Sequence, residues 1–286
     1  MKLTNALTVD VEDYFQVSAF EHSIHRSDWD NLEHRIAQNM SKVLQLFADQ
    51  EIKATFFMLS WIAERYPSMV NDIICQGHEL ASHGHGHQRV TDLTREEFRQ
   101  DIVRAKSTLE DLGGVPVRGY RAPSYSIGES NIWALEILAE AGYEYSSSIY
   151  PVKHDHYGFP KAPRFVFRDT KTGIIEVPIT TVKFMNKTLP AGGGGFFRFY
   201  PYAISRWIIN RVNTFDQQPA VFYFHPWELD PDQPRQRNTS LKSRFRHYLN
   251  LHKSEARLKR LIGDFNWGRM DEVFIDGHPI PEFQLT

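Results

Sequence analysis

The order of apolar segments along this chain predicts a parallel α/β fold. Short apolar runs, several of them rich in Thr, Val or Phe, alternate with stretches of helical period, and only short loops separate them. Repeated strand–helix units of this kind build either a doubly wound sheet or a barrel. The chain has no G-x-G-x-x-G after its first strand and no G-K-[ST], so neither glycine-rich nucleotide fingerprint is present.

The first half of the chain carries most of this alternation. Strands are expected at 6–11, 54–59, 79–82, 117–120 and 143–149, and helices at 32–50, 61–76, 94–112 and 129–141. Thr94 and Glu97 have the spacing of a capping box, which begins the third helix. Gly77, Gly113 and Gly142 lie directly after the last three of these helices, where a glycine commonly ends a helix.

The second half is less regular. An antiparallel hairpin is expected from 164–168 and 174–178, a helix at 201–214, an apolar strand at 220–224 and a basic helix at 241–262, followed by a mixed tail. Four consecutive glycines, 192–195, form either a mobile loop or a connector. Because no repeat or linker interrupts the chain, we expect one domain over 1–286.

Composition excludes several classes of protein. The chain has 33 Lys plus Arg and 35 Asp plus Glu, a formal charge of −2, which argues against nucleic acid or acidic membranes as the main partner. No apolar run is long enough to span a bilayer. The N-terminal residues show no apolar signal region, and the single cysteine, Cys75, suits a reducing compartment, so a cytoplasmic location is expected. The oligomeric state is not encoded in any pattern that we recognise.

Acidic and imidazole side chains follow two of the expected strands. Asp10, Glu12 and Asp13 come at the end of the first strand, and His83 and His87 come after the third. Carboxyl ends of parallel strands meet at one edge, where sites are built. Two imidazoles with one carboxylate form a common ligand set for a catalytic divalent cation and leave positions open for water and substrate. The sequence therefore predicts a metal site that joins these segments, with His85 outside it.

Two further strand ends carry candidate catalytic groups. Arg121, in Arg-Ala-Pro after the fourth strand, could hold a catalytic carboxylate ionised and correctly aimed. His225, after the apolar strand 220–224, is a candidate general acid.

These elements, in this order, resemble the polysaccharide deacetylase family (carbohydrate esterase family 4, the NodB homology domain). The similarity covers about residues 4–230, with 231–286 as a C-terminal extension, and its most specific part is Gly77-His-Glu-Leu-Ala-Ser-His83 with His87. The segments 10–13 and 190–201 look like a subgroup linked to bacterial exopolysaccharide and exosortase loci, similar to the allantoinase-like and peptidoglycan-deacetylase-like branch.

The resemblance implies a distorted (β/α)7 barrel and a metal-dependent hydrolase that removes N-acetyl groups from N-acetylhexosamine units. The cation would be Zn²⁺, with Co²⁺ or Ni²⁺ as other choices, and the partner a glycan. In this family pattern Asp10 matches the catalytic base, Arg121 the residue that braces it, and His225 the general acid. His83 and His87 match metal ligands. Substrate contacts are expected from Ser124, whose N–H would face the oxyanion, and from the aromatic faces of Tyr125 and Trp227.

This sequence departs from the family pattern at two places. Val11 follows Asp10 where most members have a second Asp, so the carboxylate ligand is either Glu12 or Asp13, and strand alternation favours Glu12. Residues 145–148 hold no Asp to orient His225, so a Ser or another acid would do so. Two other functions stay open: hydrolysis of a small amide or ureide, as in the allantoinase-like relatives, and a catalytically silent glycan-binding barrel.

Overall fold

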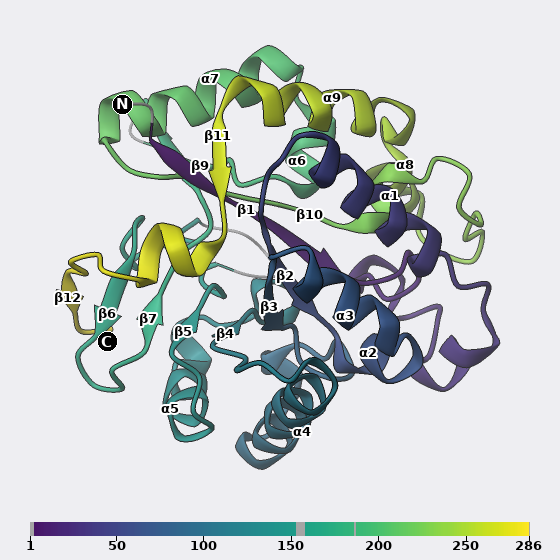
Figure 1. The fold of residues 1–286 in the computed structure, drawn as a ribbon, viewed down its shortest axis with the longest axis horizontal. Coiled ribbons are helices and arrows are strands. Elements are labelled where there is room, and N and C mark those ends of the chain that lie inside the picture. The colour runs from purple at the N-terminus through teal and green to yellow at the C-terminus, as the bar shows by residue number, and fades with distance from the viewer. Residues whose placement is uncertain (1–2, 153–157, 186, 286) are drawn as a thin grey trace.

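A largely parallel sheet forms the centre of the computed structural model, which describes residues 3–152, 158–185 and 187–285. Its strands follow the order β10-β1-β2-β3-β4-β5-β7-β6-β12, and β11 pairs with β1. Every pairing in this sheet is parallel except that of β6 with β7. The strand path does not close on itself among the described residues, which is consistent with a distorted barrel. Figure 1 shows α7 and α9 across the top of the molecule and α4 and α5 at the bottom, with the strands between them.

The first half of the chain folds as alternating strands and helices. In order these are β1 (Thr4–Val11), α1 (Ile36–Asp49), β2 (Thr55–Met58), α2 (Ser60–Arg65), α3 (Pro67–Cys75), β3 (Glu79–Ser82), α4 (Arg95–Gly113), β4 (Gly119–Tyr120), α5 (Trp133–Glu140) and β5 (Tyr145–Ser146). The capping box at Thr94 and Glu97 is present at the start of α4. This alternation confirms the predicted α/β class.

Over the residues that the structure describes, the second half adds five strands to the main sheet, a separate two-stranded hairpin and four α-helices. The elements are β6 (Phe167–Asp169), β7 (Ile175–Glu176), β8 (Thr181–Phe184), β9 (Lys187–Pro190), α6 (Gly194–Phe199), α7 (Tyr202–Arg211), β10 (Val221–Phe224), α8 (Leu241–Tyr248), α9 (Leu251–Asp264), β11 (Asn266–Gly268) and β12 (Glu282–Phe283). The predicted antiparallel pair is present as β6 and β7. The hairpin of β8 with β9, and the strands β11 and β12, were not predicted.

Two predicted helices are each divided in the structure. The helix expected at 61–76 breaks at Tyr66, because Pro67 cannot donate the next helical hydrogen bond and instead begins α3. The helix expected at 241–262 breaks at Asn250, which takes the left-handed conformation with φ 55°. Asn tolerates this conformation better than most residues do, so the chain changes direction there.

The glycine run is a built part of the fold. Gly193 pairs with Tyr223 of β10 through an isolated parallel bridge. Its φ is 127°, and a Cβ at this position would overlap the carbonyl group of Tyr223. Only glycine satisfies both conditions, so the run is a connector that packs against the sheet.

The core lies on both sides of the sheet. The strand β1 is buried from Asn5 onward, and β2, β3 and β10 are buried along their whole length. None of the described helices is long and apolar enough to cross a membrane.

Candidate functional site

The candidate site lies at the carboxyl ends of three strands. Asp10 is near the end of β1, and His83 and His225 follow β3 and β10 directly. The register pairs Val9 with Phe224, which places the next residue of each strand, Asp10 and His225, side by side. The same arrangement of β2 between β1 and β3 brings His83 to this edge. These residues are far apart in the sequence, and the parallel sheet alone brings them together.

A group of three buried side chains has the donor set of a metal site. One ligand atom each from Glu12, His83 and His87 lies within 4.8 Å of the others. The Nδ1–H of His83 donates to the backbone carbonyl of Arg121 at 2.8 Å, which leaves its Nε2 for a cation. Oε2 of Glu12 lies 2.7 Å from Nε2 of His87, yet it is buried without a hydrogen-bond partner. Donor atoms that converge in this way fit a divalent cation.

The charge states of the group agree with this fit. Burial lowers the pKa of His83 to about 4, although nearby Asp10 opposes the shift, so the ring is neutral and able to bind a metal. Burial by itself would raise the pKa of Glu12, but the electrostatic interactions with His87 and His225 outweigh it and lower this pKa to about 2. Glu12 is therefore a carboxylate at neutral pH.

Asp13 does not join this group. Its Oδ2 accepts hydrogen bonds from the backbone N–H groups of Arg35 and Ile36, at 2.7 and 3.0 Å, and its Oδ1 accepts from Tyr14 at 2.8 Å. Of the two ligand candidates left open by the sequence, the structure therefore places Glu12 with the histidines and uses Asp13 to bind the N-terminal N–H groups beside α1. The chain turns after β1, with the N–H of Glu12 bonded to the carbonyl of Asp10, and this turn sends the two carboxylates apart.

Asp10 and Arg121 form a buried ion pair beside the metal group. Nη1 of Arg121 is 2.6 Å from Oδ1 of Asp10, and the same guanidinium donates to Thr8 and to Ser147. Burial would lower the pKa of Arg121, but the charge of Asp10 raises it instead. Arg121 thus fixes the orientation of the Asp10 carboxylate, and the tyrosine hydroxyl of Tyr125 lies 3.4 Å from its second oxygen.

His225 faces the same group from β10 and is held by an acid on its own turn. Its Nε2 lies 3.3 Å from Oε1 of Glu12 and 3.9 Å from Oδ2 of Asp10. Its Nδ1 lies 2.7 Å from Oε1 of Glu228. Burial would lower the pKa of His225, but Glu12, Glu228 and Asp10 together raise it to about 9. The ring is therefore protonated at neutral pH and able to donate a proton.

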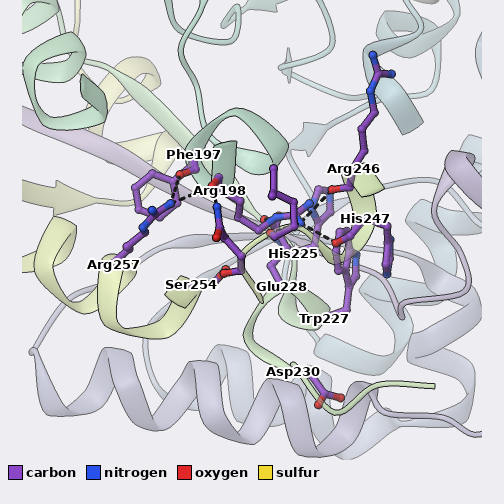
Figure 2. A network of polar contacts seen from close by, with 12 residues as sticks. Phe197, Arg198, His225, Trp227, Glu228, Asp230, Arg246, His247, Ser254 and Arg257 are labelled. Carbon is purple, nitrogen blue, oxygen red and sulfur yellow. Dashed lines mark hydrogen bonds and ion pairs between the residues drawn. The ribbon is translucent and has the colours of Figure 1, made fainter. Parts of the chain in front are cut away.

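Arg198 anchors Glu228 from the opposite side (Figure 2). Its Nε is 2.7 Å from Oε2 of Glu228, and its Nη1 donates to the backbone carbonyl of His247 at 2.6 Å. Burial would raise the pKa of Glu228, but Arg198 and His225 lower it, so this residue is ionised. The chain Arg198–Glu228–His225 fixes the ring and its Nδ1 proton.

The sequence analysis did not identify Glu228 and Arg198 as the residues that orient His225. It looked for an orienting acid at 145–148, whereas Ser147 holds Arg121 and the acid is Glu228. The available signal was the spacing His225-Pro-Trp-Glu228, because residues three apart in one turn face each other. Arg198 follows the glycine run, and no local pattern connects it to His225.

The three residues expected to contact substrate, Ser124, Tyr125 and Trp227, lie in different surroundings in the structure. Trp227 is buried and stacks on both His225 and His247, with ring centroids 5.3 and 4.2 Å away, so its ring is not an open face for a sugar. Instead, its Nε1–H donates to Oε1 of Glu12 at 3.3 Å. The ring of Tyr125 packs on Tyr150 and Tyr223. Ser124 has φ 57°, and its hydroxyl contacts the hydroxyl of Ser18.

Two family models match successive parts of the chain. Residues 28–146 match the model described as polysaccharide deacetylase, and residues 147–275 match a domain of unknown function, DUF3473. The first match covers His83, His87 and Arg121, and the second covers Arg198, His225 and Glu228. The site is therefore built from both matched segments together with β1, which precedes them.

Curated relatives match a limited part of the chain. It is 31% identical over 96 residues to a peptidoglycan-N-acetylglucosamine deacetylase of Bacillus cereus, covering 33% of this chain and 35% of that protein. It is 30% identical over 97 residues to a chitooligosaccharide deacetylase of Azorhizobium caulinodans, covering 34% of this chain and 43% of that protein. The chain thus matches less than half the length of either relative.

Solved structures share the fold over nearly the whole chain. A Mycobacterium smegmatis protein assigned as a polysaccharide deacetylase has a TM-score of 0.62 at 16% identity, covering 99% of this chain and 94% of that one. A "probable polysaccharide deacetylase" of Pseudomonas aeruginosa PAO1 has a TM-score of 0.59 at 13% identity, covering 95% and 89%. The family model thus identifies residues 28–146 as a polysaccharide deacetylase segment, and the solved structures show that the fold extends over nearly the whole chain.

Proposed function

We propose that the protein is a divalent-metal-dependent hydrolase that removes N-acetyl groups from N-acetylhexosamine units of a bacterial exopolysaccharide or its precursor. The names of the relatives support this class of substrate, because they are deacetylases of peptidoglycan and of chitooligosaccharides. The reaction adds water across the amide, breaks the C–N bond and releases acetate and a free amine on the sugar.

Glu12, His83 and His87 would hold the cation, with Zn²⁺ as the expected ion and Co²⁺ or Ni²⁺ as substitutes. When bound there, the ion would supply Lewis acidity, which lowers the pKa of water and polarises a carbonyl group. Three protein ligands leave at least one coordination position open, as in catalytic zinc sites generally.

Asp10 acts as general base in this proposal. Its Oδ1 is engaged by Arg121, so the proton of the attacking water passes to Oδ2, the oxygen that faces His225 and Tyr125. The Arg121 ion pair prevents Asp10 from rotating away during the transfer.

His225 acts as general acid and donates the Nε2 proton to the departing nitrogen. Because Glu12 would be committed to the cation, Glu228 is the carboxylate that keeps the ring charged and aimed. The backbone N–H of Ser124 remains the proposed donor to the oxyanion, since the N–H of Tyr125 is used by the carbonyl of Ala122.

The observation that supports this function most is the position of His225 Nε2. It lies within 4 Å of both Asp10 and Glu12, so an acid, a base and a metal ligand border one small space. A metal site used only for structure would not need a protonated imidazole and a second carboxylate at its open side.

The test is release of acetate and appearance of free amine on N-acetylglucosamine oligomers, with and without chelator. The wild-type protein should release acetate, chelator should abolish release, and Zn²⁺ should restore it. Asp10→Asn should lower kcat by about 10²–10⁴-fold, the usual contribution of a general base, while metal content stays constant. Asp111→Asn, which changes an exposed Asp of α4, is the matched control and should retain full activity.

Three outcomes would contradict the proposal. Turnover that survives complete metal removal would reject the metal. Wild-type turnover by Asp10→Asn would reject the base. Hydrolysis of a ureide but of no N-acetylated sugar would select the allantoinase-like alternative.

A further inference from the structure

The small net charge of this protein conceals an uneven distribution. Between residues 177 and 215 the chain has five Lys or Arg and no Asp or Glu. The total charge is −2, so the remainder of the chain carries −7. This stretch includes the hairpin of β8 with β9 and the helices α6 and α7. One of its cations, Arg198, is buried with Glu228, and the other four are Lys183, Lys187, Arg206 and Arg211.

The same stretch exposes an unusual share of large apolar side chains. Among the described residues, ten large hydrophobic side chains are exposed, and six of them lie here: Phe184, Met185, Phe199, Ile204, Trp207 and Phe215. Met185 is 83% exposed and Phe215 is 70% exposed. Soluble proteins expose single apolar side chains commonly, but a concentration of them marks an interaction surface.

Four of these side chains belong to one continuous surface. Phe184 of β8 packs edge-on against Trp207 of α7, with ring centroids 6.0 Å apart. Ile204, Trp207, Arg211 and Phe215 follow one another at helical spacing and therefore share a face. The guanidinium of Arg211 lies 4.3 Å from the ring centre of Phe215. Figure 1 shows β9 and α7 on the same side of the molecule.

We call this surface the hairpin–α7 face and define it by Lys183, Phe184, Met185, Lys187, Ile204, Trp207, Arg211 and Phe215. The hairpin forms its own two-stranded sheet and pairs with no strand of the main sheet among the described residues. Thr181 and Val182 are buried, whereas Lys183–Met185 and Lys187 are exposed and can contact a partner without disturbing the core.

We propose that the hairpin–α7 face docks the protein on the surface of an anionic lipid bilayer. Aromatic and apolar side chains would enter the headgroup region, while Lys183, Lys187 and Arg211 would bind anionic headgroups at its edge. Long basic side chains reach the interface while their stems lie along apolar groups. Arg206, which pairs with Asp264 at 3.0 Å, adds less to this attraction.

Lysine content favours a bilayer over a protein partner. Protein–protein interfaces are depleted in lysine, because its flexible, strongly hydrated ammonium is costly to fix and desolvate. Two lysines flank Phe184 and Met185 here, and no carboxylate between 177 and 215 offsets them. A lipid surface leaves such ammonium groups hydrated, so aromatic groups and lysines can act together.

The test is flotation of the full chain with vesicles of phosphatidylcholine alone and of phosphatidylcholine mixed with phosphatidylglycerol. The wild-type protein should float with the mixed vesicles, bind the neutral vesicles weakly, and dissociate from the mixed vesicles in high salt. Lys183→Gln with Lys187→Gln should weaken binding by roughly 30-fold, because each basic group near an anionic surface changes affinity by about fivefold. Phe184→Ser with Met185→Ser should weaken it by at least about tenfold.

Matched controls change equivalent groups elsewhere on the surface. Val103→Ser removes an apolar side chain of α4 that is 48% exposed, and Lys171→Gln removes an exposed lysine of the turn between β6 and β7. Both controls should float as the wild type does, and every variant should retain its thermal unfolding temperature, because the altered side chains are exposed.

Flotation that does not depend on phosphatidylglycerol, or that is equal in the hairpin variants and the controls, would overturn the proposal. Sedimentation velocity without lipid measures whether the protein forms a dimer and so tests whether a second copy of the chain occupies this face. A dimer that Phe184→Ser with Met185→Ser dissociates would assign the face to a second copy of the chain and would also overturn it. The deacetylase assay is independent of both measurements.

Discussion

Glu12→Gln and Asp13→Asn form the sharpest pair of substitutions that the structure offers. The two residues are neighbours, both are carboxylates, and both are almost fully buried, so each substitution removes one negative charge from nearly the same place. The two side chains have different partners in the structure. Glu12 joins His83 and His87, whereas Asp13 accepts three backbone N–H groups beside α1.

The expected magnitude follows from the donor set. Zinc sites with four protein ligands have apparent binding energies of about 10–16 kcal/mol, which is about 2.5–4 kcal/mol for each ligand. Loss of Glu12 as one of three ligands should therefore weaken Zn²⁺ binding by about 10²–10³-fold. In addition, a glutamine amide group would place N–H donors toward His87 and Trp227. Asp13→Asn should change the affinity by less than about threefold, since it removes no donor atom.

The assay is competition for Zn²⁺ with a chromophoric chelator at fixed pH, with thermal unfolding as the check on folding. A folded Glu12→Gln protein with wild-type Zn²⁺ affinity would refute the assignment of the ligands. A large loss of affinity in Asp13→Asn, with Glu12→Gln unaffected, would show that the hydrogen bonds of Asp13 at α1 have been misread.

Three other predictions follow from the same contacts. Glu228→Gln should lower kcat about 10–100-fold without changing Zn²⁺ affinity, because a charge-assisted bond that aims His225 is lost; an unchanged kcat in steady-state assays would remove Glu228 from the mechanism. Burial and nearby Asp271 raise the pKa of Glu79 to about 7, so the folded state holds a proton that the unfolded chain releases near pH 4.5, and stability falls as pH rises between these values. Glu79→Gln should flatten this fall of about 3 kcal/mol in denaturant titrations, and an unaltered slope from pH 5 to 7 would contradict the cause. Gly193→Ala should lower the unfolding temperature or prevent folding, since its Cβ would overlap the Tyr223 carbonyl; a variant as stable as wild type in thermal unfolding would show that the contact yields easily.

Local chemistry explains why the element order could be predicted. Alternating periodicity, the capping box at Thr94 and the glycines after helices act within a few residues, so they are readable in the sequence. The divided helices show the limit of this reasoning. Pro67 was readable as a break but lay inside a strong apolar period, and Asn250 tolerates the left-handed conformation without requiring it.

In the candidate site, too, some residues could be named from the sequence, whereas some of their contacts could not be predicted. The histidines and the first-strand carboxylates could be named because residue type and strand position point to metal chemistry. Strand alternation favoured Glu12 over Asp13, and the structure groups Glu12 with the histidines, but the outcome also depends on a backbone turn after β1 that alternation does not describe. Trp227 was expected to contact sugar because it is aromatic, but the neighbouring His225 and His247 cover its ring.

The sequence by itself determined the α/β class, the side chains able to bind a cation, and the candidate acid and base beside them, because residue chemistry and short-range periodicity are local properties. Only the tertiary structure decided that Glu12 rather than Asp13 meets the histidines, that Arg198 and Glu228 secure His225, and that the basic and apolar residues of the hairpin and α7 share a surface. These outcomes depend on distances between segments that are far apart in the chain, and such distances are fixed by sheet register and helix packing, which no local pattern specifies.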